Sequence, residues 1–275
     1  MEILRGLFED RRTIVARRYD KTWGERLRMI RSVRGESNMA RVLSYVQLAE
    51  GRKRGLKDRY PLVIEGKLLD LPLTAAAGIF RSIVARTVLE HVRASTSKIV
   101  ETGSGWGEHL CTIYLEGGPA QATYYALEPV LEGRRCARAL AAFEPRFKLK
   151  TGFFDYTAPE YGLPRDAMHT VLLTVHSIEQ VAEIHPSVIR DALTLGVEVT
   201  GIHVEPVGWQ AHPETEWSPI TAKHAARCRD MNYNRNLIPL LRTLEREGLI
   251  RIERVDVNHI GLEHNPASLI VWQKR

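Results

Sequence analysis

The sequence has few cysteines and no long apolar run, and both absences narrow its class. Its 275 residues include three cysteines, Cys111, Cys136 and Cys228, without the close pairing typical of a disulfide framework or a metal site. No apolar stretch approaches the roughly 18 residues that cross a bilayer. The first 20 residues are charged throughout and do not resemble a secretory signal. We therefore expect a protein of the reducing cytoplasm that has no membrane partner.

The positive charge of the sequence is concentrated near its beginning. The formal net charge is +6, and residues 1–60 contain 16 Lys and Arg against 8 Asp and Glu. Such a segment can be an electrostatic surface for RNA or an ordinary solvated face of helices. It lacks the interleaved aromatic residues that stack on single-stranded bases. We favour the solvated face and keep RNA as the alternative partner.

Residues 1–75 differ in pattern from the rest of the chain. They read as a mostly helical cap or lid region with a short extended segment near residues 60–73, where two apolar runs flank Glu65-Gly66-Lys67. An amphipathic helix follows, with apolar residues at helical spacing between Ile79 and Val92. Residues 76–275 are expected to form the main domain.

From residue 98 onward, expected strands alternate with expected helices. The strands are 98–101, 123–128, 147–151, 169–175, 199–205, 250–257 and 268–273, and the helices are 107–116, 131–143, 179–194 and 231–247. This alternation predicts an α/β fold, Rossmann-like, with a mainly parallel seven-stranded sheet and helices on both faces. The link between the last two strands is too short for a helical crossover, so the last strand should be antiparallel.

A glycine-rich turn, "ETGSGWG" at residues 101–107, follows the first of these strands. Glycines let a ligand approach the backbone closely, and the following helix offers free N–H groups. Dinucleotide folds use G-x-G-x-x-G, but here the third glycine is Gly107 and Glu108 stands where that pattern needs glycine. Glu101 and Glu108 beside the turn suit a ligand with an ammonium group and a cationic centre better than a pyrophosphate.

An acidic residue directly ahead of three alternating glycines resembles the first motif of the class I S-adenosylmethionine-dependent methyltransferases. The resemblance covers roughly residues 76–275, and Glu101, Gly103, Ser104, Gly105 and Gly107 carry it. It implies S-adenosylmethionine as the cofactor and S-adenosylhomocysteine as the product.

Two further strand ends match positions of that family. Glu128, followed by Pro129, ends the next strand 21 residues after Gly107, and the resemblance assigns it to the ribose hydroxyls. Asp155 and Phe154 in "KTGFFDY" match the residues that bind the adenine amino group and cover the ring. Taken alone, Glu128 could be a surface residue and Asp155 a turn cap.

The acceptor site is expected at the ends of the fourth and fifth strands, beside the cofactor. His176 ends an apolar strand and is the better candidate for a general base next to the cofactor. Glu179 could orient His176, bind a substrate hydroxyl or cap a helix. His203 could be catalytic or a packed core histidine, and Glu205 lies on the same face of that strand. No third ligand accompanies this pair, so we expect no metal.

A second polar cluster opens the helix expected near the end of the chain. Asn232, Tyr233, Asn234 and Arg235, with Trp209 from the preceding strand end, are candidate substrate-binding residues. A structural helix start explains the asparagines equally well.

The sequence contains neither [DN]-P-P-[YFW] nor a cysteine motif for cytosine C5 chemistry. The stretches "HSIEQV", "GIHVEPVGWQ" and "NPASLIVWQK" look loosely like bacterial tailoring methyltransferases, some of them described as sugar O-methyltransferases. We therefore expect methyl transfer to an O or N atom of a small molecule, saccharide or natural-product peptide, and the partner considered for the chain itself is a second copy in a homodimer. The alternatives are an RNA methyltransferase and a non-catalytic cofactor-binding or scaffold protein. A nicotinamide dehydrogenase fits least, because of Glu108.

Overall fold

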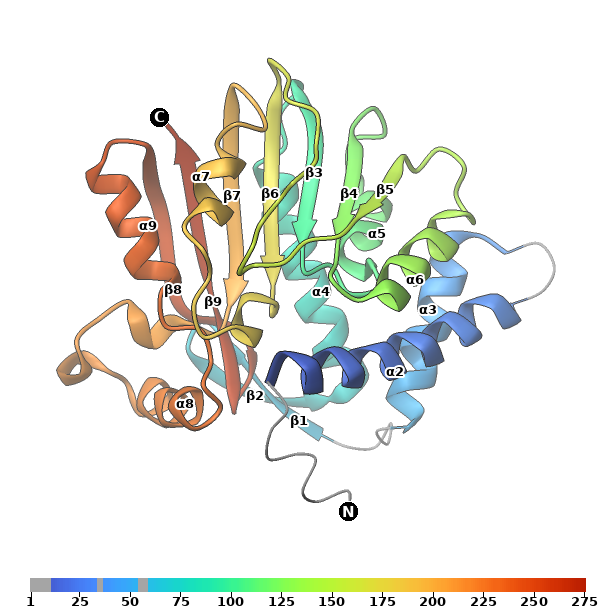
Figure 1. Ribbon diagram of the computed structural model, residues 1–275. Coiled ribbons are helices and arrows are strands. Elements are labelled where there is room, and N and C mark those ends of the chain that lie inside the picture. The colour runs from blue at the N-terminus through green and yellow to red at the C-terminus, as the bar shows by residue number, and fades with distance from the viewer. Residues whose placement is uncertain (1–10, 34–36, 54–58) are drawn as a thin grey trace.

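The structure is a computed structural model that describes residues 11–33, 37–53 and 59–275, and one mixed sheet forms its centre (Figure 1). The strands are β1 (Arg59–Ile64), β2 (Lys67–Pro72), β3 (Thr96–Thr102), β4 (Thr123–Leu127), β5 (Leu149–Gly152), β6 (His169–Val175), β7 (Glu198–Glu205), β8 (Ile250–Leu262) and β9 (Asn265–Lys274). They lie in the order β2-β1-β8-β9-β7-β6-β3-β4-β5. Strands β3 to β7 are parallel, and β9 is antiparallel to both β7 and β8. The predicted mainly parallel sheet with an antiparallel last strand is confirmed.

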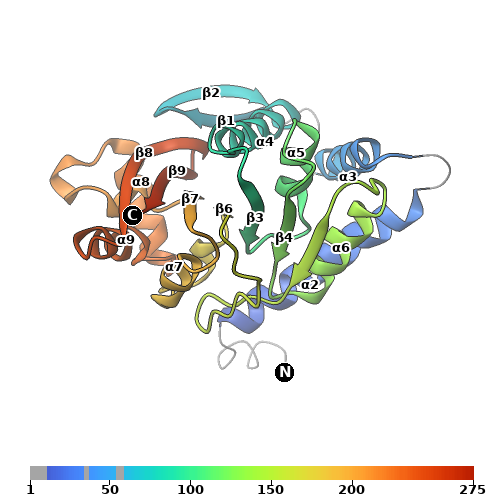
Figure 2. The same ribbon diagram turned by 90° about the horizontal axis from the view of Figure 1, so that it is seen from above.

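The sheet is wider than predicted because a hairpin joins its edge. The extended segment expected near residues 60–73 forms β1 and β2, and β1 pairs antiparallel with β8. The seven expected strands are therefore part of a nine-stranded sheet. Strand β8 continues to Leu262, well past its expected end, and so offers a free edge to β1. The hairpin thus extends the sheet through its pairing with β8, and it lies beside α4 (Figure 2). The boundary at residue 75 stays a prediction.

Helices cover both faces of the sheet (Figure 2). They are α2 (Arg11–Ser32), α3 (Met39–Lys53), α4 (Leu73–Glu90), α5 (Glu108–Leu115), α6 (Leu131–Ala141), α7 (Ser187–Ala192), α8 (Pro219–Asp230) and α9 (Leu237–Arg246). Helices α2, α3, α4, α5 and α6 share one hydrophobic core with one face of the sheet. Helices α7 and α9 share a second core with the other face. The helical segment before the hairpin therefore packs into the main core.

Two expected helices are shorter in the structure. The segment 179–194 contains a 3₁₀ turn, Ile178–Gln180, and the six-residue helix α7, which follows Pro186. The segment 231–247 forms a helix only from Leu237. Helix α8 was missed, although its start is visible in the sequence: Ser218 Oγ accepts from the Thr221 N–H at 3.2 Å, and Pro219 is its first residue.

Gly201 in β7 gives a stability prediction. A Cβ at this position would lie 2.0 Å from Cε2 of the buried Trp272, so Gly201→Ala forces the indole to move. We expect a loss of unfolding free energy of about 1–3 kcal/mol, measured by urea denaturation. Gly78→Ala in α4 is the matched control, because its Cβ would meet nothing within 4 Å. The control should be neutral or stabilising, and equal stability of both variants would contradict the packing.

No helix within residues 11–33, 37–53 and 59–275 has the length and apolar character needed to cross a membrane.

Candidate active site

A cavity of about 1010 Å³ lies where the loops after β3, β4, β5 and β6 meet α2. Strand register explains its place: Thr102 pairs with Leu127 and Val175 with Val204, so these parallel strands end at one edge of the sheet. The lining residues are Ala16, Arg17, Tyr19, Asp20, Trp23, Arg26, 103–106, Glu108, His109, 128–131, 153–156, 175–177, Gln180 and Val181. Most predicted cofactor residues are in this set; Glu101 and Gly107 flank it.

The glycine turn needs its glycines for geometric reasons. Gly103 has a φ of 68°, and a Cβ there would lie 2.4 Å from Cβ of Ser177 in the loop after β6. Gly107 has a φ of 81° and precedes the first residue of α5. The turn therefore brings backbone against the next loop and starts α5, whose first residues Glu108 and His109 line the cavity.

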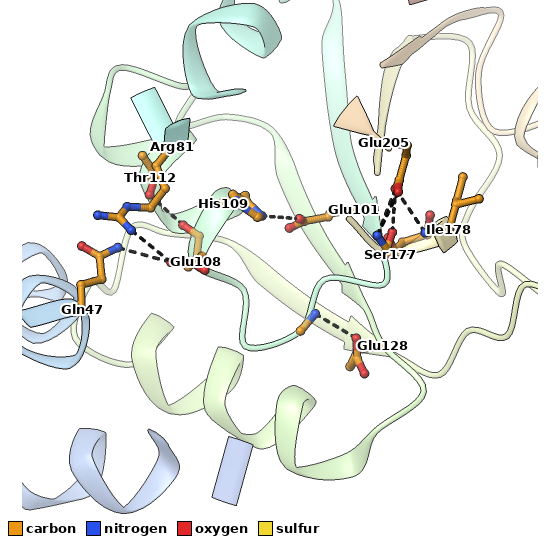
Figure 3. A network of polar contacts seen from close by, with 12 residues as sticks. Gln47, Arg81, Glu101, Glu108, His109, Thr112, Glu128, Ser177, Ile178 and Glu205 are labelled. Atoms are coloured by element: carbon orange, nitrogen blue, oxygen red, sulfur yellow. Dashed lines mark hydrogen bonds and ion pairs between the residues drawn. The ribbon is translucent and has the colours of Figure 1, made fainter. Parts of the chain in front are cut away.

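Glu101 at the end of β3 is almost fully buried and forms a pair with His109 (Figure 3). Its Oε1 lies 2.8 Å from Nδ1 of His109, and its Oε2 has no hydrogen-bond partner among the described residues. Burial raises the pKa of Glu101. Burial also acts to lower the pKa of His109, but Glu101 outweighs it and leaves that pKa raised. The pair therefore tends to retain a proton. The sequence reasoning missed His109.

Glu108, the other acidic residue beside the turn, is held by cations and amides (Figure 3). Its Oε2 accepts from Gln47 of α3 at 3.4 Å and lies 4.0 Å from Arg81 of α4. Burial alone would raise the pKa of Glu108, but His109, Arg26 and Arg81 lower it below its ordinary value. Glu108 therefore stays ionised and ties α5 to two other helices.

Glu128 lies directly below the glycine turn (Figure 3). Its Oε2 accepts from the Gly105 N–H at 2.8 Å and its Oε1 from the Val130 N–H at 3.0 Å. Burial raises the pKa of this carboxyl to about 7. The carboxylate is thus fixed at the cavity wall, as its predicted role requires, and each oxygen can accept a further hydrogen bond.

The two phenylalanines after β5 differ in exposure. Phe154 is 1% exposed and packs edge-on against Tyr156 with ring centroids 5.4 Å apart. Phe153 is 60% exposed and has the Arg134 guanidinium 5.7 Å from its ring centroid. Both line the cavity, but Phe153 has more free surface to cover a ring. Asp155 Oδ1 accepts from the N–H and hydroxyl of Thr157, both at 2.8 Å.

Helix α2 closes one side of the cavity, in keeping with the cap or lid expected of residues 1–75, which stays a prediction. A Cβ on Gly105 would lie 3.0 Å from Cζ2 of Trp23, so this indole covers the turn. Tyr19 stacks on Trp23 with centroids 5.4 Å apart. The Arg26 guanidinium lies between the rings of Trp23 and Trp106 and pairs with Glu50. The sequence marks these residues only as part of a helical segment.

His176 projects into the cavity from the end of β6 with a φ of 47°. Its Nδ1 lies 3.3 Å from Oε2 of Glu179, and Phe80 packs on its ring with centroids 5.5 Å apart. Glu179 itself is buried and does not line the cavity in the described part of the chain. Of its three predicted roles, this arrangement supports orienting His176.

Glu205 does not reach the cavity surface formed by the described residues. Its carboxylate accepts from the N–H of Ser177 at 3.1 Å and of Ile178 at 3.2 Å (Figure 3). Burial raises the pKa of Glu205 to about 7. This geometry does not support Glu205 as a catalytic candidate, because both backbone donors hold it beneath the loop that carries His176. It positions that loop.

His203 lies in the core, which fits the second of the two roles expected for it, a packed core histidine. The residue is 0% exposed; Nδ1 lies 2.9 Å from the Thr174 hydroxyl, and Nε2 accepts from Trp272 Nε1 at 2.9 Å. Burial lowers its pKa to about 3, so the ring is neutral. The described residues contain no group of three or more His, Cys, Asp or Glu placed to bind one metal ion.

Two residues of the predicted substrate rim, Asn234 and Arg235, join the start of α9 to the loop after β6. Asn234 Oδ1 accepts from the Leu237 N–H at 3.0 Å, and its Nδ2 donates to Val181 O at 3.2 Å. Arg235 pairs with Glu183 at 2.9 Å. Asn234 thus caps α9, and Arg235 helps to dock it on the loop after β6, as expected of a structural helix start; the substrate-binding role stays a prediction. Within the described ranges, the cavity lining contains none of Trp209, Asn232, Tyr233, Asn234 and Arg235.

Comparison with known proteins identifies the fold. No protein-family model matches the sequence, and no curated protein sequence matches it. The structure is similar to magnesium protoporphyrin IX methyltransferase from Synechocystis PCC 6803 with bound SAH, at 12% identity and a TM-score of 0.50 over 96% of this chain and 100% of that chain. It is also similar to a geranyl diphosphate methyltransferase in complex with GPP and sinefungin, at 11% identity and a TM-score of 0.51 over 82% of this chain and 92% of that chain. The chain has the fold of the class I S-adenosylmethionine-dependent methyltransferases.

Proposed function

We propose that the protein is an S-adenosylmethionine-dependent methyltransferase that acts on an O or N atom of a small molecule, saccharide or natural-product peptide. The observation that supports it most is a single cavity that contains both a glycine turn flanked by acidic residues and an oriented histidine. A protein that only binds cofactor does not need the second feature. The fold likeness agrees with this function.

The residues around the turn fit the cofactor. Glu101 Oε2 and Ser104 Oγ are buried polar atoms without a partner among the described residues, and both flank the turn. An ammonium or hydroxyl group of a ligand would satisfy them. Glu128 would hold the ribose hydroxyls, and Asp155 with Phe153 or Phe154 would bind the adenine. When bound, the cofactor supplies a methyl group on a positively charged sulfur.

The chain's own residues then orient the acceptor and accept its proton. His176 Nδ1 faces Glu179, so Nε2 is the nitrogen left for the cavity. As the new O–C or N–C bond forms, Nε2 takes the proton that the acceptor loses. Tyr19 and Trp23 add aromatic surface to the same cavity, and Phe80 packs on the ring of His176. Position and orientation supply much of the rate enhancement of such a transfer.

The pH dependence of turnover tests the base. Burial lowers the pKa of His176, but the hydrogen bond and charge of Glu179 and the charge of Glu205 outweigh this, and the net pKa lies above its ordinary value of 6.5; nearby His109 opposes the rise. A base works when deprotonated, so activity should fall as pH decreases through a midpoint above 6.5. We expect Glu179→Gln to move the midpoint of the kcat profile to lower pH. An unchanged midpoint would exclude His176 as the titrating base.

Calorimetry and a methyl-transfer screen test the function as a whole. We expect saturable binding of S-adenosylmethionine and S-adenosylhomocysteine, and transfer of labelled methyl to one class in a panel of metabolite, saccharide, peptide and RNA pools. Absence of binding would overturn the proposal. Binding without transfer would favour the non-catalytic alternative, and labelled RNA would favour the RNA methyltransferase.

A further inference from the structure

The contacts of Glu179 continue from the cavity to α8 through one residue, Asn265, at the start of β9. Asn265 Nδ2 donates to Glu179 Oε2 at 3.1 Å. On the other side, Asn265 Oδ1 lies 3.2 Å from Nε2 of His224, which is buried in α8. Gln180 Nε2 donates to the other Glu179 oxygen at 2.8 Å. Glu179 is therefore held by amides from two segments that are distant in sequence.

The direction of the hydrogen bonds along this chain follows from His224. Burial lowers the pKa of His224 to about 4, so its ring is neutral and carries one proton. Its Nδ1 has no partner among the described residues, whereas Nε2 faces Asn265 Oδ1. The nearby Cys228 directs its thiol toward Pro206 O at 3.8 Å, which leaves the sulfur as a weak acceptor for Nε2. Nε2–H therefore donates to Asn265 and fixes its amide orientation.

The amide orientation matters because Asn265 also touches His176. Asn265 Nδ2 lies 3.4 Å from His176 Nδ1, and Glu179 Oε2 lies 3.3 Å from the same nitrogen. A carboxylate needs a proton on Nδ1, and an amide N–H would need a lone pair there. Asn265 Nδ2 lies closer to Glu179 than to His176, so its N–H donates to the carboxylate. The carboxylate in turn accepts from His176 Nδ1–H.

We propose that Asn265 and His224 are positioning residues, which hold Glu179 so that His176 carries its proton on Nδ1 and presents the Nε2 lone pair to the cavity. This rests on the proposed function in that His176 is the base there. His224 acts on Asn265, Asn265 on Glu179, and Glu179 on His176. The turn at Asn265 and the helix α8 thereby contribute to a site whose cavity they do not line.

Nitrogen NMR of ¹⁵N-histidine-labelled protein tests the proposal without requiring turnover. The His176 signals are assigned by their loss in His176→Asn. At high pH we expect the Nδ1–H tautomer in the parent protein and a mixture of tautomers in Asn265→Leu. Asn265→Asp places a second carboxylate beside His176 and should raise the pKa of this histidine by about one unit. The parent tautomer and pKa in both variants would overturn the proposal.

Kinetics give a second readout. We expect Asn265→Leu to lower kcat about 10-fold or more while the Kd for S-adenosylhomocysteine changes less than about threefold, since the cofactor residues are untouched. If the Asn265 variants fail to fold, His224→Leu should give the same tautomer mixture, and His224→Gln, which can still donate an N–H, should restore the parent state. If His224→Gln did not keep the parent tautomer, the proposed donation from residue 224 to Asn265 would be contradicted.

The control is Lys223→Ala, an exposed position of α8 that pairs with Glu263 and should leave every readout unchanged. The outcome separates from that of the proposed function. Suppose that His176 keeps the Nδ1–H tautomer in the parent protein and that the His176→Asn variant still turns over. The positioning by Asn265 and His224 would then be supported, and the proposed role of His176 as general base would be rejected. Loss of turnover in His176→Asn with parent behaviour in Asn265→Leu and Asn265→Asp would do the reverse.

Discussion

His176→Asn should lower kcat by about 10²–10⁴-fold and leave the affinity for S-adenosylhomocysteine nearly unchanged. The factor is the usual contribution of a general base. His176 has a φ of 47°, a left-handed conformation that asparagine adopts more readily than alanine. Asparagine therefore removes the imidazole and keeps the backbone, whereas His176→Ala adds backbone strain to the same loss. Rapid-quench or steady-state methyl transfer, with calorimetry of S-adenosylhomocysteine, measures both quantities.

Ser177 and Glu205 provide the check on this prediction. The Glu205 carboxylate holds the Ser177 and Ile178 N–H groups, so a change that disturbs this loop would weaken cofactor binding as well as turnover. A parallel loss of both in His176→Asn would therefore indicate a structural effect. Retained turnover would show that the acceptor needs no base from His176, as a neutral amine acceptor can.

Glu128→Ala should weaken binding of S-adenosylhomocysteine by about 10²-fold or more. The carboxylate accepts from the Gly105 and Val130 N–H groups, and charge-assisted hydrogen bonds contribute about 1.5–3 kcal/mol each. Its removal should loosen the turn and take away the contact to ribose that we propose for it. Because burial raises the pKa of Glu128 to about 7, affinity in the parent protein should also decrease as the carboxylate is protonated below that pH. Calorimetry at several pH values measures this.

Glu160→Ala is a suitable control, because Glu160 is an exposed carboxylate outside the cavity lining. It should bind cofactor like the parent protein. Glu128→Gln retains one acceptor oxygen and should fall between the parent and Glu128→Ala. If Glu128→Ala bound cofactor normally but lost turnover, the division of roles between Glu128 and His176 would be reversed.

The sheet and the cofactor end of the site could be predicted because their sequence pattern is local. Gly103, Gly105 and Gly107 show their turn in a run of seven residues. Glu128 directly follows β4, and Asp155 comes three residues after β5, at the same end of the sheet. Each inference needed only a strand, its end and the next few residues.

The acceptor end was predicted less well because it depends on contacts between distant segments. His176 follows the end of its strand whereas His203 lies within one, which made His176 the better candidate, but only the partners Thr174 and Trp272 place His203 in the core. The partners of Asn234 and Asn236 were hidden for the same reason, because they are backbone groups of Val181 and Ile184. His109 was accessible in principle, since it stands in the first turn of the helix that opens beside Glu101.

The place of α2 has a consequence for the energetics of the whole chain. Trp23 and Arg26 contribute to the same cavity as the glycine turn, and Cys136 Sγ of α6 lies 3.1 Å from Trp23 O. A ligand that touches both walls is thermodynamically linked to their association. The part of the binding free energy that comes from contacts with α2 therefore also stabilises α2 in its packed position against the rest of the protein. A bound ligand therefore stabilises the packing of α2 against the sheet. Substitutions of α2 residues that line the cavity should change both the ligand affinity and the free energy of local unfolding of α2.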